Sequence, residues 1–227
     1  MTFFETLQHE TRADRAYLLS APLIQRCLQN GQFSLAEYIG FLTEAFHHVR
    51  HTVPLLMAVG SRLPMDKEDF RTAIAEYIAE ELGHQEWILN DLAACGADPE
   101  VIRHGKPGAA TELMVSYAYD TVMRRNPMGF FGMVFVLEGT SISLATMAAE
   151  IIQKRLGLPN KAFSYLRSHG SLDQEHMVFF EALMNRIEDT RDRDDIVHAA
   201  GRFFRLYGDI FRSIDIAADT GSAQKAA

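Results

Sequence analysis

Several features that would assign this chain to a particular class are scarce in its sequence. Cys27 and Cys95 are the two cysteines among 227 residues, too few and too far apart for a disulfide framework or a cysteine-based zinc site. We expect both to be buried as small side chains in a reducing compartment. The first residues, MTFFETLQHETRADR, are charged throughout and lack the apolar stretch of a signal peptide. We therefore expect a cytoplasmic location.

Positive charge is also scarce. The chain has 22 lysines and arginines against 30 aspartates and glutamates, which gives a formal net charge of −8 at pH 7. The basic residues are scattered along the chain and form no run. This charge distribution argues against nucleic acid or an anionic membrane surface as the partner.

Long apolar runs are limited to one segment, residues 129–148, which reads GFFGMVFVLEGTSISLATMA. Its length would allow it to span a bilayer. However, Glu138 lies in its middle and is followed by Gly139, Thr140 and Ser141, and no second such run or basic flank accompanies it. We expect the central core helix of a soluble bundle rather than a membrane span.

Alternating strand patterns are absent, whereas apolar residues recur at spacings of three and four, as on one face of a helix. With 48% hydrophobic and 23% charged residues, the composition is ordinary for a globular protein. The sequence predicts an all-α fold of about seven helices in one domain over residues 1–216, followed by a flexible tail at 217–227. The helices are expected near 13–29, 35–59, 67–95, 109–125, 128–156, 160–188 and 192–217, with Ser34 and Glu37 as a capping box.

The most informative motif is H-x-x-x-D-x-x-H, formed by His169, Asp173 and His176. At about 100° per residue, these spacings bring all three side chains to one face of a helix. Two imidazoles and a carboxylate on one face are a ligand set that a helix offers a transition metal. The motif therefore predicts a metal site.

Two further segments carry side chains that complete such a site. Glu81 and His84 form the E-x-x-H unit of di-iron carboxylate bundles, with Glu80 as a substitute carboxylate. Glu138 lies within the apolar run, where an ionised carboxylate costs several kcal/mol unless it finds an arginine, a proton or a metal. The candidate ligands are therefore Glu81, His84, Glu138, His169, Asp173 and His176, which we also expect to be the catalytic residues. Three carboxylates and three imidazoles suit two irons per chain, two manganese ions or a mixed pair.

The order of these motifs resembles that of the haem-oxygenase-like di-iron oxidases and oxygenases, whose fold is shared with haem oxygenase, thiaminase II (TenA) and pyrroloquinoline quinone synthase. The resemblance covers about residues 81–176, and the chain length and helix count suit the whole fold. Some members place the first carboxylate seven residues before the first histidine. Tyr77 occupies that position here, so the chain is most similar to the E-x-x-H branch that includes the alkene-forming fatty-acid decarboxylase.

The resemblance implies an iron-dependent oxidoreductase that activates O2 and oxidises a small carboxylic acid or amine, by C–C cleavage, desaturation or N-oxygenation. It also implies an electron donor and, by analogy with the fold, a homodimer. Arg50 is a candidate for holding the charged group of the substrate.

The sequence also allows other roles for some of these residues and other functions for the chain. Glu44, His47, His48 and His51 share one helix face and could line the substrate cavity or pair within the bundle. Glu44 could also complete the ligand set of a ferritin-like iron protein, in which His169 would be superfluous. A thiaminase II-type hydrolase would need a nucleophilic cysteine, and a cofactorless quinone-forming oxidase would need no carboxylate cluster. A non-enzymatic scaffold that has lost its metal could keep the ligand residues while its cavity is blocked.

Overall fold

The helical elements follow the predicted pattern, and the all-α fold class is confirmed. The computed structural model describes residues 1–214, except for the side chains of residues 169–176, and none of residues 1–214 lies in a β-strand. The candidate ligands His169, Asp173 and His176 and the predicted tail at 217–227 therefore lie outside what is described. The α-helices are α1 (Phe3–Glu10), α2 (Arg12–Leu19), α3 (Pro22–Asn30), α4 (Leu35–Val49), α5 (Thr52–Arg62), α6 (Glu68–Glu81), α7 (His84–Ala94), α8 (Pro99–His104), α9 (Ala109–Arg124), α10 (Phe130–Leu156), α11 (Ser164–Met184) and α12 (Thr190–Ser213), with short 3-10 turns at Met65–Lys67, Pro127–Gly129 and Asn160–Ala162.

Residues 1–214 form more α-helices than the seven expected, because three segments predicted as single helices are broken and because α1 and α8 were not predicted. The segment 35–59 divides between α4 and α5 because Pro54 has no N–H to bond to the carbonyl four residues earlier, and its ring crowds that carbonyl. The segment 67–95 divides after Glu81, where Gly83 adopts φ 90°. This left-handed conformation suits glycine, which has no Cβ. The predicted capping box of Ser34 and Glu37 is confirmed at the start of α4.

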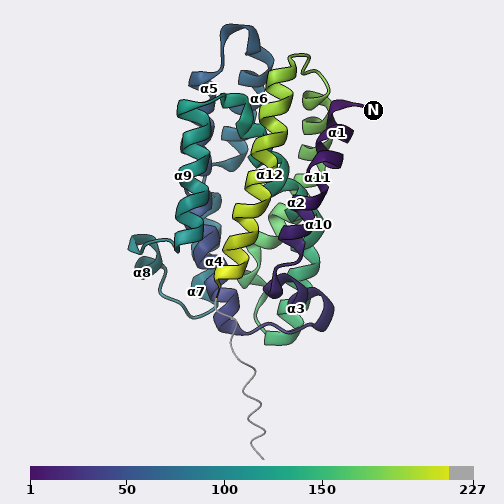
Figure 1. Ribbon diagram of the computed structural model, residues 1–227. Helices are drawn as coiled ribbons and strands as arrows, with labels where there is room; N and C mark the ends of the chain where they lie inside the picture. The colour runs from purple at the N-terminus through teal and green to yellow at the C-terminus, as the bar shows by residue number, and fades with distance from the viewer. Residues whose placement is uncertain (215–227) are drawn as a thin grey trace, which may run out of the picture.

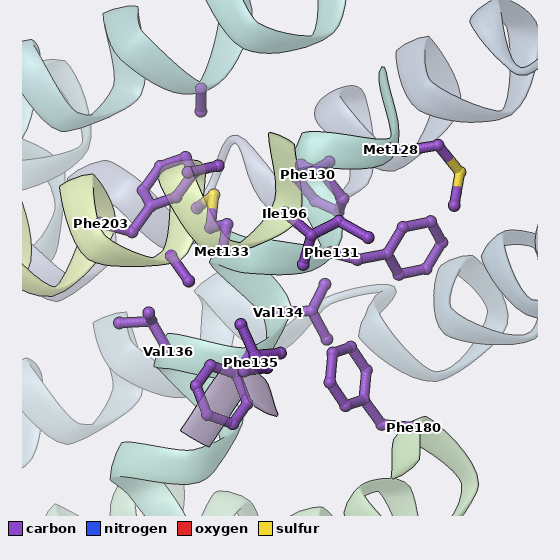
Figure 2. Close-up of a cluster of buried hydrophobic side chains, with 14 of the residues drawn as sticks. Met128, Phe130, Phe131, Met133, Val134, Phe135, Val136, Phe180, Ile196 and Phe203 are labelled. Carbon is purple, nitrogen blue, oxygen red and sulfur yellow. The ribbon is translucent and has the colours of Figure 1, made fainter. Parts of the chain in front are cut away.

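The core lies around α10, the longest apolar segment, which packs against α11, α12 and α3. In Figure 1, α12 runs along the bundle between α9 and α2, with α10 behind it. Figure 2 shows the aromatic side chains of Phe130, Phe131 and Phe135 among those of Phe180 and Phe203 from the two neighbouring helices. Burial of these large rings is the main favourable term in joining the three helices.

Helix α10, together with the turn before it, is long and apolar enough to span a membrane, and within residues 1–214 no other helix is. However, 61% of its most apolar window is buried inside the bundle. The backbones of α10 and α12 approach each other closely at Gly132, where an added Cβ would lie 2.6 Å from the backbone nitrogen of Ala200. The absence of a side chain at Gly132 thus lets the backbones of α10 and α12 come together, and α10 serves as the central core helix.

Candidate metal centre and substrate cavity

Glu81 and His84 lie on either side of the break between α6 and α7. Glu81 is the last residue of α6, and His84 is the first of α7. The prediction that both lie on one continuous helix was wrong, because Leu82 and Gly83 turn the chain between them. The turn nevertheless brings the side chains together: Glu81 Oε2 lies 3.0 Å from His84 Nδ1, and the two side chains are 13% and 4% exposed. Glu80, the substitute, is exposed on α6.

Glu81 and Glu138 line the same cavity, which we call the polar cavity and whose volume is about 90 Å³. Glu138 comes from α10, so the cavity joins carboxylates from two helices that are far apart in the chain. Its remaining lining residues are His48, Val49, Thr52, Leu56, Tyr77, Phe130, Met133, Val134, Leu137, Ser141, Tyr165 and Tyr207. Two carboxylates in a largely apolar, partly enclosed space are the kind of arrangement that a bound cation stabilises.

Helix α11, which carries His169, Asp173 and His176, packs along both α10 and α7. The side chains of these three residues lie outside the described ones, so the prediction that they join Glu81, His84 and Glu138 stays a prediction. Among the side chains that are described, no three histidine, cysteine, aspartate or glutamate residues gather closely enough to hold a metal ion. The described carboxylates and imidazole are therefore at most half of a two-metal site.

Two polar residues that line the polar cavity were not among the predicted ligands. Tyr77, four residues before Glu81 in α6, is 4% exposed, and its ring packs edge-on against Phe179 at 6.4 Å. His48 is 3% exposed and packs edge-on against Tyr207 at 5.7 Å. Both had a signal in the sequence, because Tyr77 lies seven residues before His84, the spacing considered above for a first carboxylate, and His48 lies in a histidine-rich segment. No such signal marked Tyr207, which comes from α12.

A second, apolar cavity of about 80 Å³ adjoins the polar cavity. Ser141, Tyr165 and Tyr207 line both cavities, so these three side chains form a shared wall. The other side chains of the apolar cavity are Leu23, Ile24, Cys27, Leu28, Phe33, Phe41, Thr140, Leu144, Ala145, Ala148, Ile152, Leu166 and Phe211. Such a lining suits a hydrocarbon group rather than a charged one.

The polar residues Glu44, His47, His48 and His51 do not act together, and the chain turns before His51, which is the N-cap residue of α5. Glu44 accepts hydrogen bonds from the backbone N–H of Gly108, at 3.1 Å, and from the hydroxyl of Thr111, so it caps the start of α9. His51 Nδ1 lies 3.2 Å from the hydroxyl of Tyr119, also on α9. His47 is 3% exposed. Burial is the main cause that lowers the pKa of both His47 and His51.

Of these four residues, His48 alone lines the polar cavity. Glu44 is already used at the start of α9, which counts against a ferritin-like ligand set that includes it. Arg50 is exposed, and it donates a hydrogen bond to the carbonyl of Arg103 at 3.2 Å. The suggestion that Arg50 holds the substrate was therefore wrong, because its guanidinium is directed to α8 and not to the polar cavity.

Both cysteines are buried, as predicted. Burial raises the pKa of Cys27 to about 11 and that of Cys95 to about 11, so both are neutral thiols at physiological pH. The thiolate is the nucleophilic form. Cys27 lines the apolar cavity rather than the polar one. Neither cysteine thus has the environment that a thiaminase II-type nucleophile needs.

The chemistry of the described candidate ligands is suited to iron. Carboxylate and imidazole groups are iron ligands, and Glu81, Glu138 and His84 supply both kinds within a small region of α6, α7 and α10. His84 Nδ1 lies 3.0 Å from Glu81 Oε2, an ion-pair distance, and a neutral imidazole can bind a metal through whichever nitrogen carries its lone pair.

Solved structures share the fold over nearly the whole chain. A domain of unknown function with a haem oxygenase-like fold from Shewanella denitrificans has a TM-score of 0.82 and 22% identity, over 94% of this chain and 92% of that one. A TenA homologue from Pseudomonas syringae has a TM-score of 0.77 and 14% identity, over 93% and 91%. Haem oxygenase from Leptospira interrogans has a TM-score of 0.74 and 16% identity, over 93% and 99%.

These likenesses establish the haem oxygenase-like and TenA-like fold that the sequence predicted. No curated protein sequence matches the chain. The family model described as "Iron-containing redox enzyme" matches residues 39–208, which run from within α4 into α12 and include all six candidate ligands. The chain therefore belongs to this family of iron-containing redox enzymes.

Proposed function

We propose that the protein is an O2-activating non-haem di-iron oxidase or oxygenase that acts on a small organic acid or amine. The observation that carries this proposal is that Glu81 and Glu138, from different helices, line one cavity beside the helix of the H-x-x-x-D-x-x-H motif. The ligands would be Glu81, His84, Glu138, His169, Asp173 and His176. Two irons per chain are proposed, with manganese or a mixed pair as the alternative.

The chain's own residues would prepare this centre and keep water from it. Bound iron would supply the one-electron and O2 chemistry. Glu81 and His84, whose side chains are in ion-pair contact, would hold each other in place, and both would be ligands of the metal. Apolar side chains of the polar cavity, such as Met133 and Val134, would limit the access of solvent to the reacting group.

The two adjoining cavities suggest how a substrate would lie. Its carboxylate or amine would occupy the polar cavity near Glu81 and Glu138, and its apolar part would pass the wall of Ser141, Tyr165 and Tyr207 into the apolar cavity. The reaction would be an oxidative C–C cleavage, desaturation or N-oxygenation of the group that remains in the polar cavity. An electron donor, a homodimer and a cytoplasmic location belong to the same proposal.

Anaerobic loading with Fe(II) tests the centre. We expect about two irons per chain in the parent protein and O2 uptake when the loaded protein is exposed to air. Glu138→Ala should lose at least one of the two irons because it removes a ligand. Glu150→Ala is the matched control, since Glu150 is an exposed glutamate of the same helix. Failure of the parent to bind iron, or equal iron content in Glu138→Ala, would overturn the proposal.

The substrate class is tested by O2 uptake with carboxylic acids and amines of increasing chain length. Ala148 lines the apolar cavity, and a phenylalanine there would fill part of its volume. We expect Ala148→Phe to reduce turnover of the longer substrates while the shortest ones are still oxidised. If Ala148→Phe leaves the chain-length profile unchanged, the apolar cavity does not hold the substrate.

A further inference from the structure

A buried carboxylate outside the candidate ligand set joins α7, which begins with His84, to α11, which carries His169, Asp173 and His176. Asp91 of α7 is 0% exposed. Its Oδ1 accepts hydrogen bonds from the backbone N–H of Ser164, at 3.0 Å, and from the Ser164 hydroxyl, and its Oδ2 accepts one from the N–H of Tyr165, at 2.9 Å. Asp91 therefore holds the first two residues of α11.

This contact replaces a cap that α11 does not provide for itself. The N-cap residue of α11, Phe163, makes no side-chain cap hydrogen bond. The first N–H groups of a helix need acceptors, and a negative charge there interacts favourably with the helix dipole. An unpaired buried carboxylate would cost several kcal/mol, so Asp91 and the start of α11 each satisfy the other.

The segment before α11 is fixed as well. Tyr38 donates a hydrogen bond from its hydroxyl to the carbonyl of Ala162 at 2.7 Å, and its ring stacks on Phe163 at 5.2 Å. Asp91 thus acts on a chain segment whose approach is already set by packing. Asp91 adds hydrogen bonds between α7 and the first residues of α11, and these bonds fix the orientation of that end of α11 relative to α7.

The location of Asp91 relates it to the metal centre. Asp91 follows His84 by seven residues, which is close to two helical turns, so both side chains lie on the same face of α7. On the other helix, Tyr165 lies one turn before His169, and its ring lines both cavities. Each helix therefore carries a candidate ligand near its contact at Asp91: His84 lies about two turns along α7, and His169 lies about one turn beyond Tyr165 along α11.

We propose that Asp91 is a positioning residue for the proposed metal centre: by holding Ser164 and Tyr165, it sets the separation of α7 and α11 and hence the distance between their ligands. This inference rests on the proposed di-iron function. Asp91 does not touch the metals in this proposal, and it acts through the placement of α11. Partners that hydrogen-bond a ligand directly typically change metal affinity by 10- to 100-fold when removed, and we expect Asp91, which acts one step away from the ligands, at the lower end of that range.

The test compares Asp91→Asn and Asp91→Ala with Val122→Ala, a control that leaves a void in α9 at a fully buried position away from both cavities. Asp91→Asn keeps the size and an acceptor oxygen, so it should weaken Fe(II) binding under nitrogen less than Asp91→Ala does. We expect at least about a tenfold weakening for Asp91→Ala and parent affinity for Val122→Ala at similar loss of stability. Parent Fe(II) affinity in Asp91→Ala would overturn the inference.

A metal-free measurement separates failure of this inference from failure of the proposed function. Spin labels at the exposed positions Ala93 of α7 and Glu181 of α11 report the distance between the two helices. We expect a broader or shifted distance distribution in Asp91→Ala and an unchanged one in Val122→Ala. If the parent protein binds no iron, the proposed function fails. If the Ala93–Glu181 distance distribution is unchanged in Asp91→Ala, the positioning role of Asp91 fails, whether or not the parent binds iron.

Discussion

Replacement of Glu44 distinguishes a structural glutamate from a metal ligand. Its carboxylate accepts from the N–H of Gly108 and the hydroxyl of Thr111 at the start of α9. Loss of a helix cap costs about 1 kcal/mol, and hydrogen bonds to a charged group contribute about 1.5–3 kcal/mol. Because Glu44 is partly exposed, we expect Glu44→Ala to lower the free energy of unfolding by about 2 kcal/mol.

The assay is urea unfolding of the metal-free protein, combined with iron content after anaerobic loading. For a chain of this size, a loss of about 2 kcal/mol corresponds to a melting temperature roughly 4–8 °C lower. Glu112→Ala is the matched control, because Glu112 lies exposed in the first turn of α9. Its interaction with the helix dipole contributes roughly 0.5 kcal/mol. We expect neither variant to change the iron content.

Two results would refute this reasoning. If Glu44→Ala lost one iron per chain while its free energy of unfolding stayed within about 0.5 kcal/mol of the parent value, Glu44 would be a ligand, as in the ferritin-like alternative. If it changed neither quantity, the hydrogen bonds to Gly108 and Thr111 would contribute nothing to stability. The combination of lower stability and retained iron is the outcome that the contacts of Glu44 predict.

Three further predictions follow from packing and burial. Gly132→Ala should lower the free energy of unfolding by about 1–3 kcal/mol, because the added Cβ would meet the backbone of α12. Gly139→Ala, in the same helix, places its Cβ in open space and should raise the free energy of unfolding by up to about 1 kcal/mol. Equal effects of the two variants in urea unfolding would contradict this prediction. Cys27 and Cys95, both with a raised pKa, should react with a thiol reagent at pH 8 only as fast as the protein opens, and rapid labelling of the native protein would disprove it. The lowered pKa of His51 means that the unfolded chain binds a proton more readily, so the free energy of unfolding should fall as pH drops below about 6.5; His51→Gln should flatten this fall, and an unchanged pH profile would count against it.

The sequence predicted the class of the fold and the types of residue at the site, and it failed where the chain turns. Apolar spacing of three and four identified the helical segments, and Ser34 with Glu37 located the start of α4. The break between Glu81 and His84 was missed because a single glycine within a helical pattern is usually tolerated. The split at α4 and α5 had a signal in Pro54 that the periodicity outweighed.

Local pattern could identify groups that share a helix face, but not the side of the bundle that they face. Glu44, His47, His48 and His51 looked alike in the sequence, whereas the structure assigns Glu44 to the start of α9 and His48 to the polar cavity. Likewise, nothing in the sequence distinguishes Asp91 from an exposed aspartate, since its partners lie more than seventy positions later in the chain.

The amino-acid sequence by itself determined that the chain is helical and that its core centres on the apolar run of α10, and it predicted which carboxylates and imidazoles would bind iron. These properties depend on spacing and composition, which are local. The tertiary structure alone decided that Glu81 and Glu138 line one cavity, that an apolar cavity adjoins it, and that Asp91 connects α7 to α11. Such relations depend on how helices distant in sequence pack against one another, and no local pattern records that arrangement.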